Sequence, residues 1–177
     1  APYMQIAVTY REEGKLKKAI DWAEKAINAD GKVDFDDFEA MFFRCITYVF
    51  DGQETKFREE VDRILSLVTD NEAEFDEQEI KEYVAARFAE NSYMFFQRNY
   101  YKAASVFAEA ALKFKSDSDI RELYETSDNI HKAFEEWELL EDSSNIIDPI
   151  KRYVALTLSE ISEGEVEDAD YIVDEIM

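Results

Sequence analysis

Apolar residues recur every three or four positions along most of the chain, and this spacing is typical of the buried face of an α-helix. The first apolar stripe ends at Gly14, and a second stripe begins at Leu16. Glycine accepts the left-handed backbone conformation that closes a helix. Residues 2–29 are therefore expected to form two helices joined by a tight turn.

The same pattern predicts two further hairpins of helices. One is expected at 35–69, with its turn at Gly52. The other is expected at 78–115, with its turn at Asn99, because asparagine is the usual non-glycine residue in the left-handed conformation.

The C-terminal part of the chain follows a different pattern. A single apolar stripe predicts one long helix at 118–142, and a break at 127–129, which would create an additional hairpin, is the alternative. A last hairpin is expected at 148–177, where Pro149 suits a first helical turn. No long linker separates these elements, so we expect one domain, 1–177, of about eight to nine helices.

The composition favours helices over sheets. The 177 residues include only 4 Gly and 2 Pro, too few for the many tight turns of a β-protein. The 13 Phe and 10 Tyr, within a hydrophobic fraction of 46%, are sufficient for a buried core and exclude a disordered acidic tail. The predicted fold class is all-α.

The hairpins resemble the tetratricopeptide repeat, whose signature places large and small residues at fixed positions of two helices. The first hairpin matches the signature at Tyr3, Ile6, Ala7, Tyr10, Ala19, Ala23 and Ala26. The hairpin at 78–115 matches it at Phe88, Ser92, Phe95, Tyr101, Ala104, Ala108 and Ala111. A degenerate copy matches it at Met41, Cys45, Tyr48, Phe57, Val61 and Ile64. The resemblance implies a short right-handed α-solenoid of antiparallel hairpins that binds other proteins.

In that family the first helix of each repeat lines a concave groove. The resemblance places the following residues there: Met4, Val8, Phe42, Ile46, Val49, Ala89, Tyr93, Phe96, Val154, Leu158 and Ile161. These side chains are apolar or aromatic, so the groove is expected to bind a partner peptide or helix. The alternative is that the helix at 118–142 fills the groove and completes the core. The family's clamp for a C-terminal carboxylate is not expected, because Met4 and Val8 replace its Lys and Asn.

The charge narrows the classes of partner. With 42 acidic and 20 basic residues, the formal net charge is −22. This charge disfavours nucleic acids and anionic membrane surfaces as partners, because proteins bind both of them mainly through Lys and Arg side chains. It favours basic proteins, basic peptides and divalent cations, although the charge could also serve only to keep the protein soluble.

One acidic loop, residues 26–37, resembles an EF-hand calcium loop. The candidate calcium ligands are Asn28, Asp30, Asp34 and Asp37. The match is incomplete, because Ala26 occupies the first ligand position and the last ligand is an Asp rather than the bidentate Glu. A calcium-responsive helical module is thus the second hypothesis, and an acidic loop that caps the next helix is the structural alternative. DGK-type loops also occur in the acidic, helical tellurite-resistance TerB-like group.

Residues suited to catalysis are few. His131 is the only histidine, and Asp128 precedes it by one helical turn, which is not sufficient for a di-metal site. Cys45 lies in an apolar segment and is expected in the core. We therefore expect no enzymatic activity and no required cofactor. The single cysteine and the lack of a long apolar run predict a cytoplasmic protein, or a processed chain that has lost a targeting segment.

Overall fold

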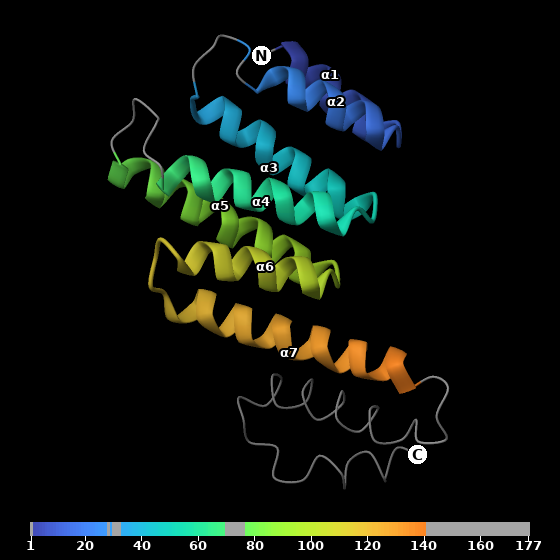
Figure 1. The fold of residues 1–177 in the computed structure, drawn as a ribbon, viewed down its shortest axis with the longest axis vertical. Coiled ribbons are helices and arrows are strands. Elements are labelled where there is room, and N and C mark those ends of the chain that lie inside the picture. Colours follow the sequence, from blue (N-terminus) through green and yellow to red (C-terminus); the bar gives the residue numbers. More distant parts are fainter. Residues whose placement is uncertain (1, 28, 30–32, 70–76, 141–177) are drawn as a thin grey trace, which may run out of the picture. The chain divides into compact units, whose positions relative to one another are not determined.

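The computed structural model describes residues 2–27, 29, 33–69 and 77–140 of the chain (Figure 1). These residues form α-helices and contain no strand, so the predicted all-α class is confirmed for them. The helices are α1 (Pro2–Glu12), α2 (Leu16–Ala26), α3 (Phe35–Phe50), α4 (Glu54–Thr69), α5 (Glu77–Gln97), α6 (Tyr101–Leu112) and α7 (Ser118–Leu140). The predicted hairpin at 148–177 lies outside the described residues, so the expected total of eight to nine helices is not tested.

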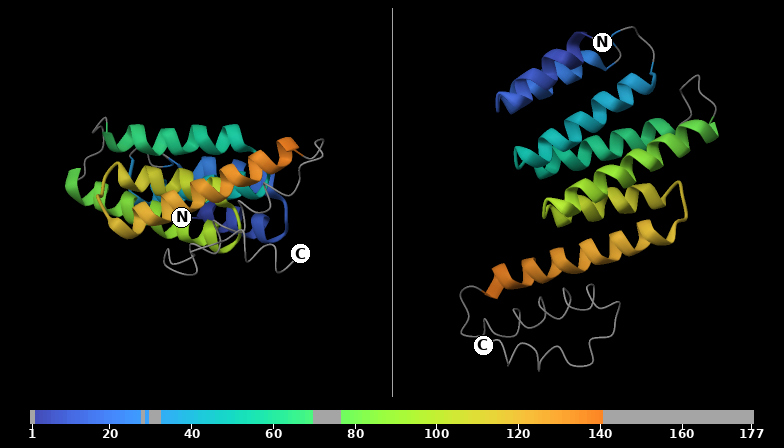
Figure 2. Two further views of the ribbon diagram at one scale, coloured as in Figure 1. Left: turned by 90° about the horizontal axis from the view of Figure 1, so that it is seen from below. Right: turned by 180° about the vertical axis from the view of Figure 1, so that it is seen from behind.

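The described residues fall into two compact units. Among the described residues, unit 1 contains those up to residue 88 and 113–115, and unit 2 contains 89–112 and 116–140. The boundary falls within α5, so each unit includes part of that helix. In unit 1, α1, α2, α3 and α4 lie side by side in chain order, as two views show (Figures 1 and 2).

Three hairpin turns depend on one left-handed residue each. Gly14, Gly52 and Asn99 have φ angles of 73°, 68° and 65°, and Asn99 is the one non-glycine residue with positive φ among those described. These are the residues that the sequence predicts at the turns. Each turn ends one helix and begins the next within three residues, which makes the two helices of a hairpin antiparallel.

The three turns also share one hydrogen-bond pattern, the Schellman motif. In each turn, the N–H of the left-handed residue donates to the backbone carbonyl three residues earlier. The N–H of the following residue donates to the backbone carbonyl five residues earlier. The bonds are Gly14 to Arg11 (3.0 Å) and Lys15 to Tyr10 (2.8 Å), Gly52 to Val49 (3.1 Å) and Gln53 to Tyr48 (2.9 Å), and Asn99 to Phe96 (3.0 Å) and Tyr100 to Phe95 (2.9 Å). The turns are therefore structural copies of one another, although the sequences around them differ.

A small residue occupies the same position, relative to the turn, in the first helix of each hairpin. Ala7, Cys45 and Ser92 all have no exposed surface, and each stands seven residues before the left-handed residue of its turn. At this position Ser92 donates a hydrogen bond of 2.7 Å from its Oγ to the backbone carbonyl of Ala104 in α6. The same spacing of large and small residues recurs in α7, where Ser127 is fully buried and Ile130 is almost fully buried.

A charged network connects three helices of unit 1. Arg44 of α3 donates hydrogen bonds to Glu60 of α4 (2.9 Å) and to the Tyr48 hydroxyl (2.8 Å). It also forms an ion pair with Glu24 of α2, which pairs with Arg63 at 3.1 Å. Arg44 and Glu60 are both buried. An ion pair in such a place contributes little net stability, because removing its charges from water offsets their attraction.

The pKa values of the two buried partners shift for different reasons. Burial, together with the nearby Glu24, raises the pKa of Glu60, and Arg44 and Arg63 offset this rise only in part. Burial alone would lower the pKa of Arg44, but Glu60, Tyr48 and Glu24 together raise it. Arg44 therefore stays charged at every pH of interest, and the ionisation of Glu60 decides how the pair responds to pH.

In unit 2, α7 packs along α6. Tyr101 of α6 stacks on Phe134 of α7 with ring centroids 6.2 Å apart, and Ile130 and Ala133 of α7 are buried. The helix α7 continues through 127–129, so the alternative of a break there does not occur. No helix in the described part of the chain is long and apolar enough to cross a membrane.

We predict that the left-handed turn residues tolerate glycine but not alanine. Asn99→Ala should cost about 1 kcal/mol of unfolding free energy, because a Cβ without a local hydrogen bond disfavours the left-handed conformation. Asn99→Gly, which also loses the 2.9 Å bond from the Tyr101 hydroxyl, should be the more stable of the two variants. Urea denaturation measures both. Equal stabilities would contradict the assignment.

We also predict an asymmetric response of the buried pair. Arg44→Met should cost about 3 kcal/mol at pH 7, because the Glu60 carboxylate then stays buried without its principal cation. Glu60→Gln should change the unfolding free energy by less than about 1 kcal/mol, because no carboxylate is then buried and Arg44 keeps its ion pair with Glu24 and its hydrogen bond to Tyr48.

The sign of the pH dependence follows from the raised pKa of Glu60. A carboxyl whose folded-state pKa is raised contributes most stability below its unfolded pKa of about 4.3, and this contribution is lost as pH rises through the folded pKa. The loss should be steeper in Arg44→Met, and adding Glu60→Gln to that variant should restore stability at pH 7. Urea titrations at pH 5 and pH 7 test this; a double variant no more stable than Arg44→Met would refute it.

Candidate functional site

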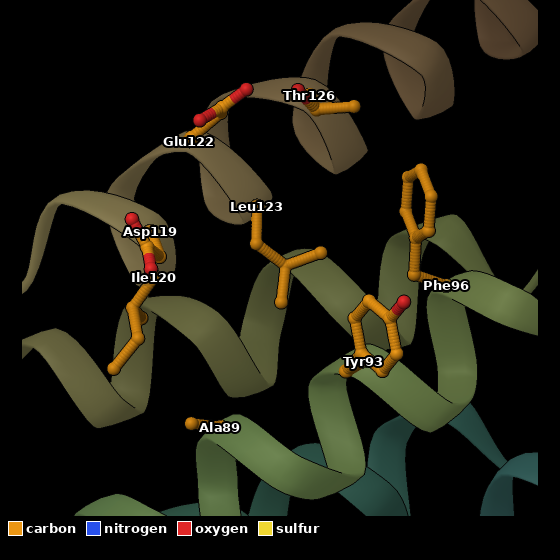
Figure 3. A pocket seen from close by; sticks show the side chains of 8 residues that line it. All are labelled: Ala89, Tyr93, Phe96, Asp119, Ile120, Glu122, Leu123 and Thr126. Atoms are coloured by element: carbon orange, nitrogen blue, oxygen red, sulfur yellow. The ribbon is translucent and has the colours of Figure 1, made fainter.

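Unit 2 contains an open pocket between the end of α5 and the first half of α7 (Figure 3). Its volume is about 470 Å³. The residues that line it are Ala89, Tyr93 and Phe96 of α5, and Asp119, Ile120, Glu122, Leu123 and Thr126 of α7. The pocket is thus formed by two helices that are separated in the sequence by α6.

The wall from α5 is a helical stripe. Ala89, Tyr93 and Phe96 are spaced by four and three residues, so they share one face of the helix. Tyr93 is 56% exposed, more than any other large hydrophobic residue described. The Schellman turn at Asn99 positions this wall, because the Asn99 N–H donates to the carbonyl of Phe96 itself.

The wall from α7 begins at the first turn of that helix. Asp117 caps α7 by accepting hydrogen bonds at Oδ1 from the N–H groups of Asp119 (3.0 Å) and Ile120 (3.3 Å). Ile120 and Leu123 project from α7 toward α5, on the side where Tyr93 stands (Figure 3). The cap thus fixes where α7 starts and which of its residues face the pocket.

Aromatic side chains support the pocket from the side of α6. Phe96 contacts Tyr101 edge to face, with ring centroids 5.5 Å apart, and Tyr101 stacks on Phe134. Such pairs are worth about 0.5–1.5 kcal/mol beyond the area they bury. Phe96 is therefore held in place, whereas the neighbouring Tyr93 has most of its ring available.

The edge of the pocket is acidic. Asp119 and Glu122 are both exposed, and none of the eight lining residues is basic. Neither carboxylate has a cationic partner within the described residues, although Asp119 accepts a hydrogen bond of 3.3 Å from the Ser118 hydroxyl. The site therefore combines an apolar interior with unneutralised negative charge at its edge.

The structure brings together only some of the predicted groove residues. Tyr93 and Phe96 line the pocket, together with Ala89. In unit 1, Met4 and Val8 pack against a cluster of Ala7, Ala19, Ala23 and Phe43, and Ile46 and Val49 are partly buried. Val154, Leu158 and Ile161 lie outside the described residues.

Phe42 requires a correction. It is 1% exposed and contacts Phe88 edge to face, with centroids 4.9 Å apart, so it belongs to the core of unit 1 rather than to an open groove. The α5 segment of that unit covers it: Tyr83 donates a hydrogen bond to Glu39, and Arg87 donates one to the same carboxylate at 2.7 Å.

The residues that sequence reasoning missed all come from α7. Ile120 and Leu123 belong to the apolar stripe of the helix predicted at 118–142, whose packing into the groove was the alternative, and the structure places both on a wall of the pocket. Asp119, Glu122 and Thr126 flank that stripe at helical spacing. Their spacing was visible in the sequence, but the position of α7 relative to α5 was not.

The candidate calcium loop is only partly described. Asp34 and Asp37 form a reciprocal cap of α3: Asp34 Oδ1 accepts from the Asp37 N–H at 3.1 Å, and Asp37 Oδ2 accepts from the Asp34 N–H at 2.9 Å. Asn28 and Asp30 lie outside the described residues. The two described carboxylates therefore act as the helix cap that was the structural alternative to metal binding.

The other candidates for chemistry are engaged elsewhere. His131 Nε2 lies 3.0 Å from Glu135 Oε1, and Asp128 pairs with Lys132 at 2.6 Å. Cys45 is fully buried, and burial raises the pKa of its thiol well above the usual value. Within the described ranges, no group of three or more His, Cys, Asp and Glu residues could hold a metal ion.

Comparisons with known proteins return no match: no protein-family model, no curated protein and no solved structure matches this chain. The likeness to tetratricopeptide repeats therefore stands on the residues and turns described above.

We predict that the reciprocal cap between Asp34 and Asp37 stabilises the folded protein. Asp34→Ala should lower the unfolding free energy by about 1 kcal/mol, because the N–H of Asp37 loses its acceptor, and Asp34→Ser should restore most of the loss. Thermal denaturation with and without millimolar calcium measures the effect. A rise in Tm on adding calcium that Asp34→Ala removes would instead support the calcium hypothesis.

Proposed function

We propose that this chain is a non-enzymatic binding module, built from tetratricopeptide-like hairpins, that holds a segment of a partner protein in the unit 2 pocket. The observation that carries the proposal is the 56% exposure of Tyr93 in an open pocket whose interior is apolar and whose edge carries two carboxylates. Exposed apolar surface that is concave and rimmed by polar residues is typical of interaction sites.

The hairpins support the tetratricopeptide-like part of the proposal. Three turns with a left-handed residue at the same place and the same Schellman bonds are expected of a repeat array. The buried small residues Ala7, Cys45 and Ser92 stand at the signature position where two helices of a repeat approach most closely. A right-handed solenoid of these hairpins is the arrangement that we propose.

The residue types in the pocket favour a protein over a small charged metabolite. Tyrosine is enriched at interaction hot spots, because its ring buries a large area at low cost in side-chain entropy. The lining includes no Lys, Arg or His to hold a phosphate or a carboxylate. The partner must therefore contribute mainly apolar side chains.

Two further observations fit this role. Cys45 is buried and His131 is paired with Glu135, and both lie apart from the pocket lining. The single cysteine also fits a reducing compartment such as the cytoplasm.

The proposal predicts that Tyr93→Glu leaves the protein folded and abolishes partner binding. The side chain is mostly exposed, so its replacement should change Tm little, whereas a hot-spot loss of at least about 2 kcal/mol should reduce captured partner by more than tenfold. Affinity purification with quantitative mass spectrometry measures the loss. Tyr3→Glu is the matched control, since Tyr3 is also exposed but lies in unit 1.

Two outcomes would overturn the proposal. One is a partner retained equally by the wild type and both variants, which would place binding elsewhere. The other is a Tyr93→Glu variant that unfolds, with Tyr93→Ala also destabilised by several kcal/mol, which would make Tyr93 a core residue.

A further inference from the structure

We infer that the segment held in the unit 2 pocket is a basic amphipathic helix, with apolar side chains in the pocket and Lys or Arg beside Asp119 and Glu122. This inference rests on the proposed function, because it names the chemistry of the partner for the same site.

The walls of the pocket fit a helix in length. The stripe from Ala89 through Tyr93 to Phe96 spans seven residue steps, and the stripe from Asp119 to Thr126 also spans seven. At 1.5 Å per residue, each wall presents about 10 Å, or two helical turns. Two turns of a partner helix offer apolar side chains at i, i+3 or i+4, and i+7 toward such a groove.

Backbone hydrogen bonding favours a helix over an extended peptide. An extended segment needs acceptors and donors for its N–H and C=O groups, either from a strand edge or from polar side chains. Both walls are helices, and the lining provides one hydroxyl from Tyr93, one from Thr126 and two carboxylates. A helical segment satisfies its own backbone groups and requires none of these.

The acidic edge of the pocket favours a partner that carries positive charge. Asp119 and Glu122 lie one helical turn apart on α7, exposed and without a cationic partner in the described part of the chain. An acidic helix would place like charges beside them, whereas Lys or Arg on the flank of a helix can reach them. The net charge of −22 adds long-range attraction for the same partner.

The test uses the full chain of 177 residues and three fluorescein-labelled peptides of about 18 residues, which is about five helical turns. The first peptide has Leu at i, i+3, i+4 and i+7 with Lys at the flanking positions. The second has the same Leu pattern with Glu in place of Lys. The third has the composition of the first in scrambled order, so it keeps the charge but has no apolar stripe. Fluorescence anisotropy measures binding.

The Lys peptide should bind at least about tenfold more tightly than either the Glu peptide or the scrambled peptide. Tyr93→Glu should abolish this preference for the ordered stripe, although it makes the protein more acidic. Neutralising the edge with Asp119→Asn and Glu122→Gln should weaken binding by about threefold to tenfold at low salt, since two exposed ion pairs are lost. The matched control, Glu109→Gln with Glu125→Gln, removes two exposed carboxylates of unit 2 outside the pocket and should change binding by less than about twofold.

Each contrary result has a distinct meaning. Equal binding of the scrambled peptide would reduce the effect to bulk attraction and overturn the inference. Equal binding of the Glu peptide would remove the charge preference but leave the pocket as a helix-binding site, so the proposed function would stand. A photo-reactive residue at position 93 that cross-links to residues 141–177 of the same chain would overturn both, because the chain would then fill its own pocket.

Discussion

The structure depends on one backbone constraint, the left-handed residue that ends the first helix of each hairpin. The Schellman bonds around Gly14, Gly52 and Asn99 reverse the chain within three residues, so the second helix can only return along the first. That return brings the backbones together at Ala7, Cys45 and Ser92, where a larger side chain would separate the helices. In unit 2 the same constraint reaches the candidate site, because the carbonyl that accepts the Asn99 N–H belongs to Phe96 of the pocket wall.

The sequence predicted local features better than it predicted which helices cover one another. The turns at Gly14, Gly52 and Asn99 could be predicted because their conformation is decided by a few neighbouring residues. The cap at Asp34 and Asp37 is equally local, and it was foreseen as the alternative to calcium. Phe42 was assigned wrongly to the groove, because its burial depends on the α5 segment that carries Phe88 and Arg87, more than forty positions away in the chain.

The helix α7 also shows that a sequence predicts a helix face better than it predicts what covers that face. Its apolar stripe is continuous, and the sequence offered two outcomes, a groove that α7 fills or a groove left open for a partner. The structure covers most of the stripe. Ile130 and Ala133, in the second half, are buried near the stacked rings of Tyr101 and Phe134. In the first half, Ile120 is 9% exposed and Leu123 is partly buried, and both line the wall of an open pocket. Periodicity identifies the face of a helix that seeks apolar contact, but it does not show where along that face a neighbour ends.

The distribution of charge explains why the pocket beside this stripe should attract a foreign helix rather than a second copy of the chain. Basic residues are outnumbered by 42 to 20, and several are committed to internal pairs: Arg44 with Glu60, Arg87 with Glu39, Lys102 with Glu135 and Lys132 with Asp128. The carboxylates of Asp119 and Glu122 have no such partner among the described residues, and they stand beside the most exposed tyrosine. Two copies that each carry a net charge of −22 repel one another, so apolar contact through this pocket would have to overcome that repulsion. A basic helix gains apolar contact and charge attraction together, because its apolar face enters the pocket while its cations neutralise the carboxylates at the edge.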